Sequence, residues 1–411
     1  TRGWTVGETV LTVTDTGTIP GVGTQTYTST QTFDAKHRLL SVNGPRAGTI
    51  DVTGYGYFAD TPVSADTGRL HTVTDPVGLV TTFENYDVYG TARKTTDPNG
   101  VITELVTDPR GRATSRTVKA VAGDPEPADY VTGYTYDTRD RLTRMTHPRG
   151  NAVAYVYEDG TNRLTETIRL DSAGLQQERL LLTLNDIGAK TREEAQVCSA
   201  AAAVCPSWST RRSEKYTYDT KNRLSQILFP VPLPADSKTI AYAYDGGGLL
   251  SSVKDERHID PNTLYTYDAL GRLWTVTQKM PLASKPDVST TYGYDVHDSL
   301  TSLTDPNGNI TTWVWDDFRR LRSQTSPVTG STTYTYDEAG NLLTSTDANA
   351  AVTTRTYDGA GRLLTASSAR AGRTTELITN TYDDAVASYG KGRLKSASVS
   401  EGGTSTASTV Y

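Results

Sequence analysis

Five aspartates that follow a tyrosine in repeated Tyr-Asp dipeptides are the first candidates for acid–base chemistry. They are Asp137, Asp219, Asp268, Asp337 and Asp358. Two carboxyl groups can share the roles of general acid and general base only when different surroundings push their pKa values apart. Repetition of the same position argues against such a difference, so we expect these aspartates to accept backbone hydrogen bonds in turns. The sequence therefore predicts no catalytic residue.

The chain contains two cysteines, Cys198 and Cys205. An isolated pair this close favours a disulfide that closes a surface segment if the protein is exported. The alternative is two free thiols in a reducing compartment. A zinc site is disfavoured because no histidine lies nearby and zinc usually takes four ligands.

Other metal and nucleophile patterns are weak. The segment Asp305–Asp316 resembles a calcium loop, but isoleucine occupies its sixth place, where the sharp turn needs glycine. The histidines are scattered and match no triad or metal spacing, and they are His37, His71, His147, His258 and His297. We therefore expect no metal site and no cofactor.

The element that positions these residues is a short hairpin, seen in full at Tyr265–Leu273. Tyr265 and Tyr267 are two residues apart and share one face of a strand. Asp268 opens a turn, and Gly271 supplies the positive φ that closes it. Arg272 then begins the returning strand, which gives a β-hairpin.

Copies of this hairpin recur along the chain. Their residues are Tyr134, Tyr136, Asp137, Tyr216, Tyr218, Asp219, Tyr334, Tyr336, Asp337, Gly340, Tyr357, Asp358, Gly361 and Arg362. Between Asp295 and Asp358 the copies are spaced by 21 residues. Such fixed self-similarity is typical of a repeat architecture.

A second turn motif lies between the hairpins, as in Thr96-Asp97-Pro98-Asn99-Gly100 and Thr304-Asp305-Pro306-Asn307-Gly308. Proline fixes one φ and glycine accepts the left-handed region, so the chain reverses there. Two turns per unit, at opposite ends, predict a continuous antiparallel sheet of roughly 28 strands that must curl. Little helix is expected.

Successive units should place their aromatic side chains in a row on one face of the sheet. Tyr267, Tyr294, Trp315 and Tyr336 occupy the same place in their units. Equivalent strands lie about 9–10 Å apart, so arginine and leucine side chains should fill the gaps. The repeat arginines and tyrosines could instead stack on a sugar or a peptide, but arginine over a neighbouring tyrosine ring is the favoured interpretation.

The combination Tyr-x-Tyr-Asp-x-x-Gly-Arg-Leu with Asp-Pro-Asn-Gly between copies resembles the YD repeat of the Rhs family. That family includes bacterial polymorphic toxins, the cocoon component of Tc toxin complexes and teneurins. The resemblance covers roughly residues 30 to 395 and implies a β-strip that coils into part of a hollow shell. It further implies a non-enzymatic scaffold that encloses or displays a polypeptide, such as a toxin domain, in an exported bacterial protein.

The resemblance also leaves a second interpretation, a cell-surface adhesion or carbohydrate-binding protein with a glycan ligand. Family toxins usually end in an aspartate-dependent self-cleavage site. The sequence Asp75–Leu79 resembles such a site, but it lies among the early repeats, and we assign no cleavage role to it. The implied location is secreted or cell-surface, and the implied partners are other segments of a longer Rhs polypeptide.

Composition agrees with a thin sheet. There are 24 tyrosines but only 5 phenylalanines. The aromatic faces of the sheet should therefore be partly exposed to solvent, with tyrosine hydroxyl groups that need hydrogen-bond partners. The net charge of −6 gives no nucleic-acid signal, because such proteins usually carry a basic stripe. No apolar run approaches the roughly 20 residues of a membrane-spanning helix.

The expected organisation has three parts. Residues 1–30 should form degenerate edge strands, and residues 31–395 the repeat strip. The strip should be interrupted at about 187–215 by an insertion whose alanine-rich middle could form a helical turn, and at 230–234 by a proline-rich loop. Residues 396–411, rich in serine, threonine and glycine, should continue into a further repeat.

Overall fold

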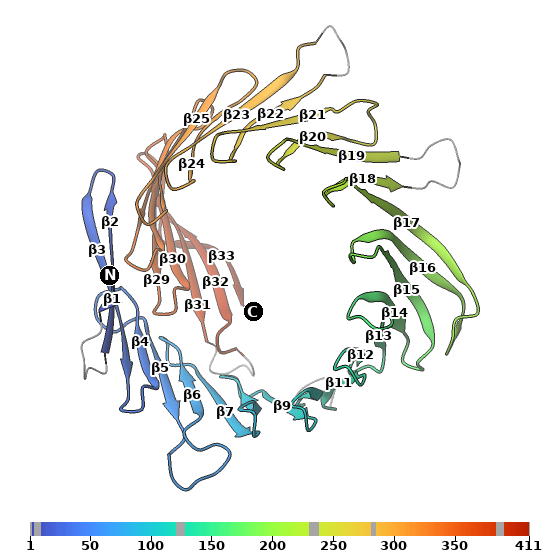
Figure 1. The fold of residues 1–411 in the computed structure, drawn as a ribbon. Helices are drawn as coiled ribbons and strands as arrows, with labels where there is room; N and C mark the ends of the chain where they lie inside the picture. Colours follow the sequence, from blue (N-terminus) through green and yellow to red (C-terminus); the bar gives the residue numbers. More distant parts are fainter. Residues whose placement is uncertain are drawn as a thin grey trace. The chain divides into compact units, whose positions relative to one another are not determined.

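The computed structural model describes residues 2–3, 10–120, 128–229, 238–280, 285–383 and 390–410. Over these ranges it contains 33 strands, all in one antiparallel sheet, and no helix (Figure 1). The predicted all-β fold of repeated hairpins is confirmed. The strand count exceeds our expectation because the weakest repeat regions are also strands. The proline-rich loop at 230–234 lies outside the described residues.

The chain forms two compact units, residues 1–104 with 293–411 (unit 1) and residues 105–292 (unit 2). The strands within unit 1 are β1 (Arg2–Gly3), β2 (Val10–Ile19), β3 (Gly23–Phe33), β4 (Leu39–Asn43), β5 (Val52–Tyr57), β6 (Leu70–Thr74), β7 (Val80–Tyr86), β8 (Ala92–Thr96), β24 (Leu300–Thr304), β25 (Ile310–Trp315), β26 (Leu321–Ser326), β27 (Gly330–Tyr336), β28 (Leu342–Thr346), β29 (Val352–Tyr357), β30 (Leu363–Ala369), β31 (Glu376–Tyr382), β32 (Leu394–Glu401) and β33 (Thr404–Val410).

The strands within unit 2 are β10 (Ala113–Val118), β11 (Tyr130–Tyr136), β12 (Leu142–Thr146), β13 (Ala152–Tyr157), β14 (Leu164–Leu170), β15 (Gln176–Leu184), β16 (Lys190–Ala202), β17 (Trp208–Tyr218), β18 (Leu224–Phe229), β19 (Lys238–Tyr244), β20 (Leu250–Lys254), β21 (Thr263–Tyr267) and β22 (Leu273–Gln278). The remaining two, β9 (Ile102–Thr107) and β23 (Val288–Tyr294), include the unit boundaries in the sequence.

The hairpin of β21 and β22 shows how one unit is built. The Asp268 N–H donates to the Arg272 carbonyl at 2.9 Å, and the Gly271 N–H donates to the Asp268 carbonyl at 3.0 Å. The register shifts at Thr266/Tyr267, so that Tyr267 lies opposite Leu273. Gly271 has a φ of 78°, which a residue without a Cβ adopts at little cost.

The two faces of this hairpin differ in chemistry. Tyr265 and Tyr267 are half-buried on one face, whereas Thr266 is exposed on the other. The Thr266 hydroxyl contacts the Thr275 hydroxyl at 2.6 Å across the strands. Few apolar residues are buried among those that the structure describes, and they are Leu11, Ile19, Ala152, Ile168, Leu170 and Cys205. Most of the described sheet is therefore a single layer, in agreement with the tyrosine-rich composition.

The segment expected to be an insertion, residues 187–215, is part of the sheet. It forms most of the long hairpin β16–β17, in which Cys198 lies opposite Trp208. The helical turn expected for its alanine-rich middle is wrong, because β16 runs through Ala200 to Ala202 as a strand. Ala202 pairs with Gln176 of β15, and the same strand pairs with β17 up to Cys198, so sheet pairing outweighs the helix propensity of alanine.

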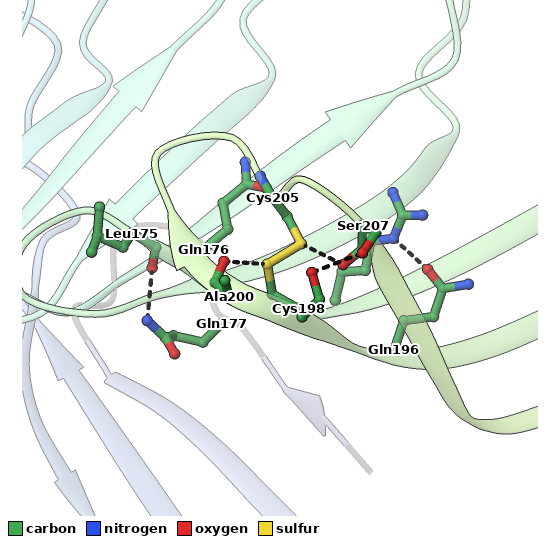
Figure 2. Close-up of a disulfide and its surroundings, with 10 residues drawn as sticks. Leu175, Gln176, Gln177, Gln196, Cys198, Ala200, Cys205 and Ser207 are labelled. Atoms are coloured by element: carbon green, nitrogen blue, oxygen red, sulfur yellow. Dashed lines mark hydrogen bonds between the residues drawn. A yellow bond between two sulfur atoms is a disulfide. The ribbon is translucent and has the colours of Figure 1, made fainter.

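A disulfide joins Cys198 and Cys205 at the tip of this hairpin (Figure 2). The Ser207 hydroxyl donates to the Ser199 hydroxyl oxygen at 2.7 Å, and the Cys205 N–H donates to the Gln176 side-chain oxygen at 3.1 Å. Because Gln176 belongs to β15, the closed tip is attached to the neighbouring strand.

Within unit 1, turns from the last third of the chain contact the first strands. We call this set of contacts the seam, made by Thr18 with Asp317, Tyr27 with Phe318, Arg46 with Asp358 and Gly359, and Asn99 with Lys391. Thr18 and Asp317 are 299 residues apart and are joined by two hydrogen bonds of 2.7 and 3.1 Å. The seam therefore joins turns of late units to the loops and the β2–β3 hairpin of early ones.

The described residues include no helix with the length and apolar character needed to cross a membrane.

Candidate functional site: an Asp–Arg–Tyr ladder

The repeat aspartate organises its own turn. One Asp268 carboxylate oxygen accepts the Leu270 N–H at 2.9 Å and the Arg272 N–H at 3.0 Å. The other oxygen accepts Nε–H of the Arg272 guanidinium at 2.8 Å. Both oxygens are therefore occupied within one turn, which is the backbone-acceptor role expected from the sequence.

The same arrangement recurs wherever aspartate is followed four residues later by arginine in such a turn. The Nε–Oδ2 distance is 2.6–2.9 Å in the pairs Asp34–Arg38, Asp108–Arg112, Asp137–Arg141, Asp219–Arg223, Asp268–Arg272, Asp316–Arg320 and Asp358–Arg362. Two units use asparagine in place of arginine, Asp305–Asn309 and Asp337–Asn341, each with a 2.8 Å amide contact. Since both oxygens of Asp305 serve its own turn, the weak calcium signal there is explained by turn chemistry.

Six of these arginines also reach the next unit, where the guanidinium lies over the tyrosine that precedes the next turn. The distance to the ring centroid is 4.3–5.5 Å for Arg38 over Tyr57, Arg112 over Tyr136, Arg141 over Tyr157, Arg223 over Tyr244, Arg320 over Tyr336 and Arg362 over Tyr382. The expectation of arginine over a neighbouring tyrosine is confirmed for these pairs. A guanidinium so placed is attracted by the ring and shields it from water.

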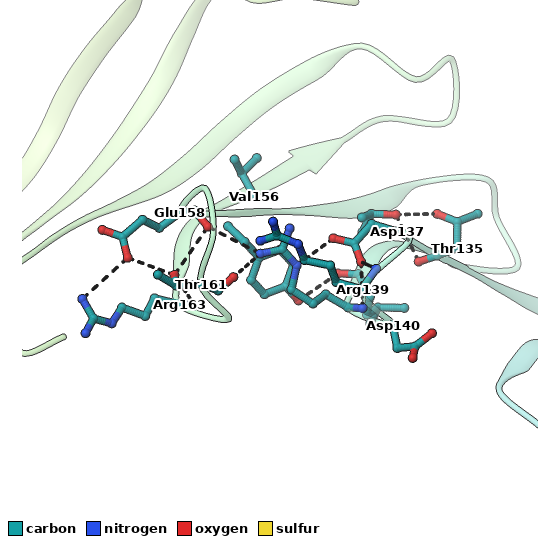
Figure 3. A network of polar contacts seen from close by, with 12 residues as sticks. Thr135, Asp137, Arg139, Asp140, Val156, Glu158, Thr161 and Arg163 are labelled. Atoms are coloured by element: carbon teal, nitrogen blue, oxygen red, sulfur yellow. Dashed lines mark hydrogen bonds and ion pairs between the residues drawn. The ribbon is translucent and has the colours of Figure 1, made fainter. Parts of the chain in front are cut away.

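The arginine completes its contacts on the backbone of the next turn. Arg141 donates to the carbonyl oxygens of Glu158 and Thr161, and Figure 3 shows these two residues beside the turn of Asp137. Arg320 donates likewise to the carbonyl of Asp337 at 3.1 Å. One side chain thus holds two consecutive turns in register.

The tyrosine forms a hydrogen bond back to the previous unit. The sequence did not lead us to expect this contact. Its hydroxyl donates to the carbonyl of the leucine after the previous turn at 2.6–3.0 Å, in the pairs Tyr57–Leu39, Tyr86–Leu70, Tyr157–Leu142, Tyr244–Leu224, Tyr267–Leu250, Tyr336–Leu321, Tyr357–Leu342 and Tyr382–Leu363. Trp315 uses its indole N–H in the same way, to Leu300 at 2.8 Å. The signal was present, because a half-buried tyrosine hydroxyl needs a partner.

The first aromatic residue of each pair lies on the same face of the sheet as the second. Tyr134, Tyr265 and Tyr334 are half-buried on the same face as the second tyrosine. Tyr216 differs, because the Lys190 ammonium lies 4.2 Å from its ring centroid. The second tyrosine of that pair, Tyr218, donates to the Lys190 carbonyl at 2.7 Å. Lys190 therefore covers the first ring of the pair, and its carbonyl accepts the hydroxyl of the second, as the leucine carbonyl does in other units.

Ion pairing and backbone donors shift the acidity of the ladder. Backbone hydrogen bonds from Arg272, followed by its guanidinium, hold the pKa of Asp268 below the ordinary 3.8. The pKa values of Asp34, Asp108, Asp137 and Asp219 are lowered by equivalent partners. Burial raises the pKa of Tyr267 above 10.0, which keeps its hydroxyl protonated as a donor.

We expect the sheet to lose stability in acid. A carboxyl group whose pKa is lower in the folded state stabilises the fold above its unfolded pKa, here 3.8, and this stabilisation is lost as the pH falls through the folded pKa. The melting temperature should therefore be flat near neutral pH and drop below about pH 4. Asp268→Asn should flatten the acid limb, whereas the exposed Glu338→Gln should not. An acid limb unchanged by Asp268→Asn would contradict this role.

The turn glycines should tolerate no branched side chain. Gly271 and Gly340 have φ values of 78° and 87°. Gly271→Val and Gly340→Val should each lower the free energy of unfolding by roughly 1–3 kcal/mol, because a β-branched residue is strained at positive φ. Gly246→Val is the matched control, since an added Cβ there meets no atom within 4 Å and φ is not positive. Denaturant titration measures the free energy of unfolding, which should fall in Gly271→Val and Gly340→Val but stay near wild type in Gly246→Val.

Outside the ladder, the structure shows an arginine-lined hollow and side-chain contacts of two histidines. No cluster of three or more metal-ligating side chains occurs in the ranges that the structure describes. A hollow of about 440 Å³ in unit 2 is lined by several arginines, and its carboxylate, Glu178, forms an exposed ion pair with Arg169 at 3.4 Å. The Nδ1 atom of His258 lies 2.6 Å from a carboxylate oxygen of Asp255. The rings of His71 and Phe58 are stacked, with their centroids 4.1 Å apart.

Comparison with known proteins gives one family and one set of structures. The model of the RHS Repeat family matches residues 136–173, 294–331, 315–352 and 336–375. No curated protein matches the chain. The crystal structure of TcdB2-TccC3 is similar over 95% of this chain and 23% of that chain, with 15% identity and a TM-score of 0.66. The same complex without its hypervariable C-terminal region gives 13% identity, coverages of 95% and 22%, and a TM-score of 0.65.

Proposed function

Because this chain is a member of the Rhs/YD-repeat family, we propose that it is a segment of a structural shell that encloses or displays a polypeptide in an exported bacterial protein. The Asp–Arg–Tyr ladder carries the proposal. Its carboxylates, guanidinium groups and hydroxyls bind the same unit or the next one. The repeated polar groups thus serve cohesion between units, which is the property a wall requires.

The modular contacts support a role as a wall in a second way. In repeat proteins each unit contacts mainly its neighbours, so length can be added without a new core. Here arginine and tyrosine link one turn to the next. The seam then ties early units to late ones within unit 1. Cohesion along the strip and across the seam would together resist opening by an enclosed chain.

Two further observations support the finer parts of the proposal. The disulfide Cys198–Cys205 fits an oxidising compartment and hence export. The chain spans about a quarter of the length of the TcdB2-TccC3 chain that it matches, so the partners we propose are further segments of a longer polypeptide. A toxin domain is the cargo that the family resemblance favours.

Protease protection of the natural full-length protein tests enclosure. Segments outside the sheet should resist a non-specific protease in native buffer and become cleavable in guanidinium concentrations that unfold the sheet. A spectroscopic probe of strand content in the same samples provides the control. Complete cleavage of those segments while the sheet stays intact would overturn enclosure. Binding of the intact protein to a glycan array would then favour the adhesion alternative.

A further inference from the structure

Two turns of identical sequence, Asp-Pro-Asn-Gly, lie in different surroundings in unit 1. Their backbones match closely. Gly100 and Gly308 have φ values of 80° and 81°. Their N–H groups donate to the aspartate carbonyl at 2.9 and 3.0 Å. The two turns therefore differ chiefly in the contacts that their asparagine side chains make.

The side chain of Asn99 belongs to the seam. Its amide nitrogen donates to the Lys391 carbonyl at 3.0 Å, and its amide oxygen accepts the Lys391 N–H at 2.7 Å. Asn99 is half-buried, whereas Asn307 is exposed and its carboxamide has no hydrogen-bond partner among the described residues. One carboxamide is held at both ends and the other is free to rotate.

Asparagine followed by glycine is open to attack by its own backbone. The glycine nitrogen forms a bond to the asparagine Cγ, the bond from Cγ to the amide nitrogen breaks, and ammonia leaves with the proton of the glycine N–H. Water then opens the cyclic imide to aspartate or isoaspartate. Glycine has no side chain to hinder this approach. The carboxamide must rotate to present Cγ, so both bonds to Lys391 have to break first at Asn99.

We propose that Asn99 is a modification site gated by the seam. A closed seam protects its carboxamide, and an open seam allows deamidation. The product cannot return to the same contact, because a carboxylate has no N–H for the Lys391 carbonyl and its oxygen would face that carbonyl oxygen. Deamidation of Asn99 therefore records opening and disfavours reclosure. This device is independent of what the shell encloses.

The first test follows both asparagines in one sample. The intact protein is incubated in mildly alkaline buffer, and deamidation is measured by peptide mapping with mass spectrometry and isoaspartate detection. Asn307 should convert first, and Asn99 at least about fivefold more slowly, since two hydrogen bonds must break. In guanidinium the two rates should converge. Equal rates in the native protein would overturn the proposal, and so would a persistent difference in guanidinium.

The second test mimics the product. Asn99→Asp should increase hydrogen exchange at the Lys391 amide, because the Lys391 carbonyl loses its donor and faces a carboxylate oxygen, which weakens the whole contact, while Asn307→Asp should leave that amide unchanged. Far-UV circular dichroism of both variants shows whether the sheet is retained. A folded Asn99→Asp protein with wild-type protection at the Lys391 amide would refute the claim that deamidation of Asn99 disfavours reclosure of the seam.

Discussion

Replacing Trp315 by alanine should lower local stability around β25 and β26 by about 3–5 kcal/mol. The indole takes the place of the ladder tyrosine, and its N–H donates to the Leu300 carbonyl at 2.8 Å. Truncation removes a large apolar surface and leaves that carbonyl without its partner. Distant units should stay folded, because coupling in repeat proteins is mainly between neighbours.

Hydrogen exchange followed strand by strand measures this effect. Protection should fall in β24 to β26 of the Trp315→Ala protein and remain near wild type in β10 to β13. Trp274→Ala is the matched control, since the Trp274 side chain is 52% exposed on β22 and should cost only about 0.5 kcal/mol. A uniform loss of protection across all strands after Trp315→Ala would refute a modular ladder.

Replacing Arg46 by methionine should release the seam within unit 1 at a cost of about 3–5 kcal/mol. Arg46 and Asp51 are each buried, and their Nε–Oδ2 distance is 3.4 Å. The guanidinium also donates to the carbonyl oxygens of Asp358 and Gly359 at 2.8 and 2.5 Å. Methionine keeps most of the volume but leaves Asp51 as a buried, uncompensated charge, and this is the dominant loss.

A double variant separates charge from packing. Arg46→Met with Asp51→Leu should regain much of the stability, because replacing both partners of a buried pair costs far less than removing one. Arg373→Met, at an exposed position, is the control for the loss of one arginine. Exchange at the amides of residues 358–361 should rise in the single variant only. Wild-type melting of Arg46→Met would contradict this account of the seam.

The local parts of this protein are determined by its sequence. Asp268, Gly271 and Arg272 lie within one turn, so aspartate, positive φ and a returning strand specify the hairpin without distant help. Regular spacing then predicted that arginine and tyrosine of adjacent units would meet, as Arg141 and Tyr157 do. The leucine carbonyl that accepts the tyrosine hydroxyl was missed because it depends on the register between units, such as the pairing of Val253 in β20 with Thr263 in β21.

Two features could be seen only in the tertiary structure, namely the sheet pairing of residues 187–215 and the seam. Residues 187–215 lack the tyrosine pairs yet remain in the sheet, because neighbouring strands supply their backbone partners. The seam joins Arg46 to Gly359, whose added Cβ would lie 2.1 Å from the Ile50 carbonyl oxygen. Nothing in either local sequence marks that approach. Arg46 and Gly359 are 313 residues apart in the sequence, so their contact forms only when the late turn packs on the early loop, and local propensity carries no information about it.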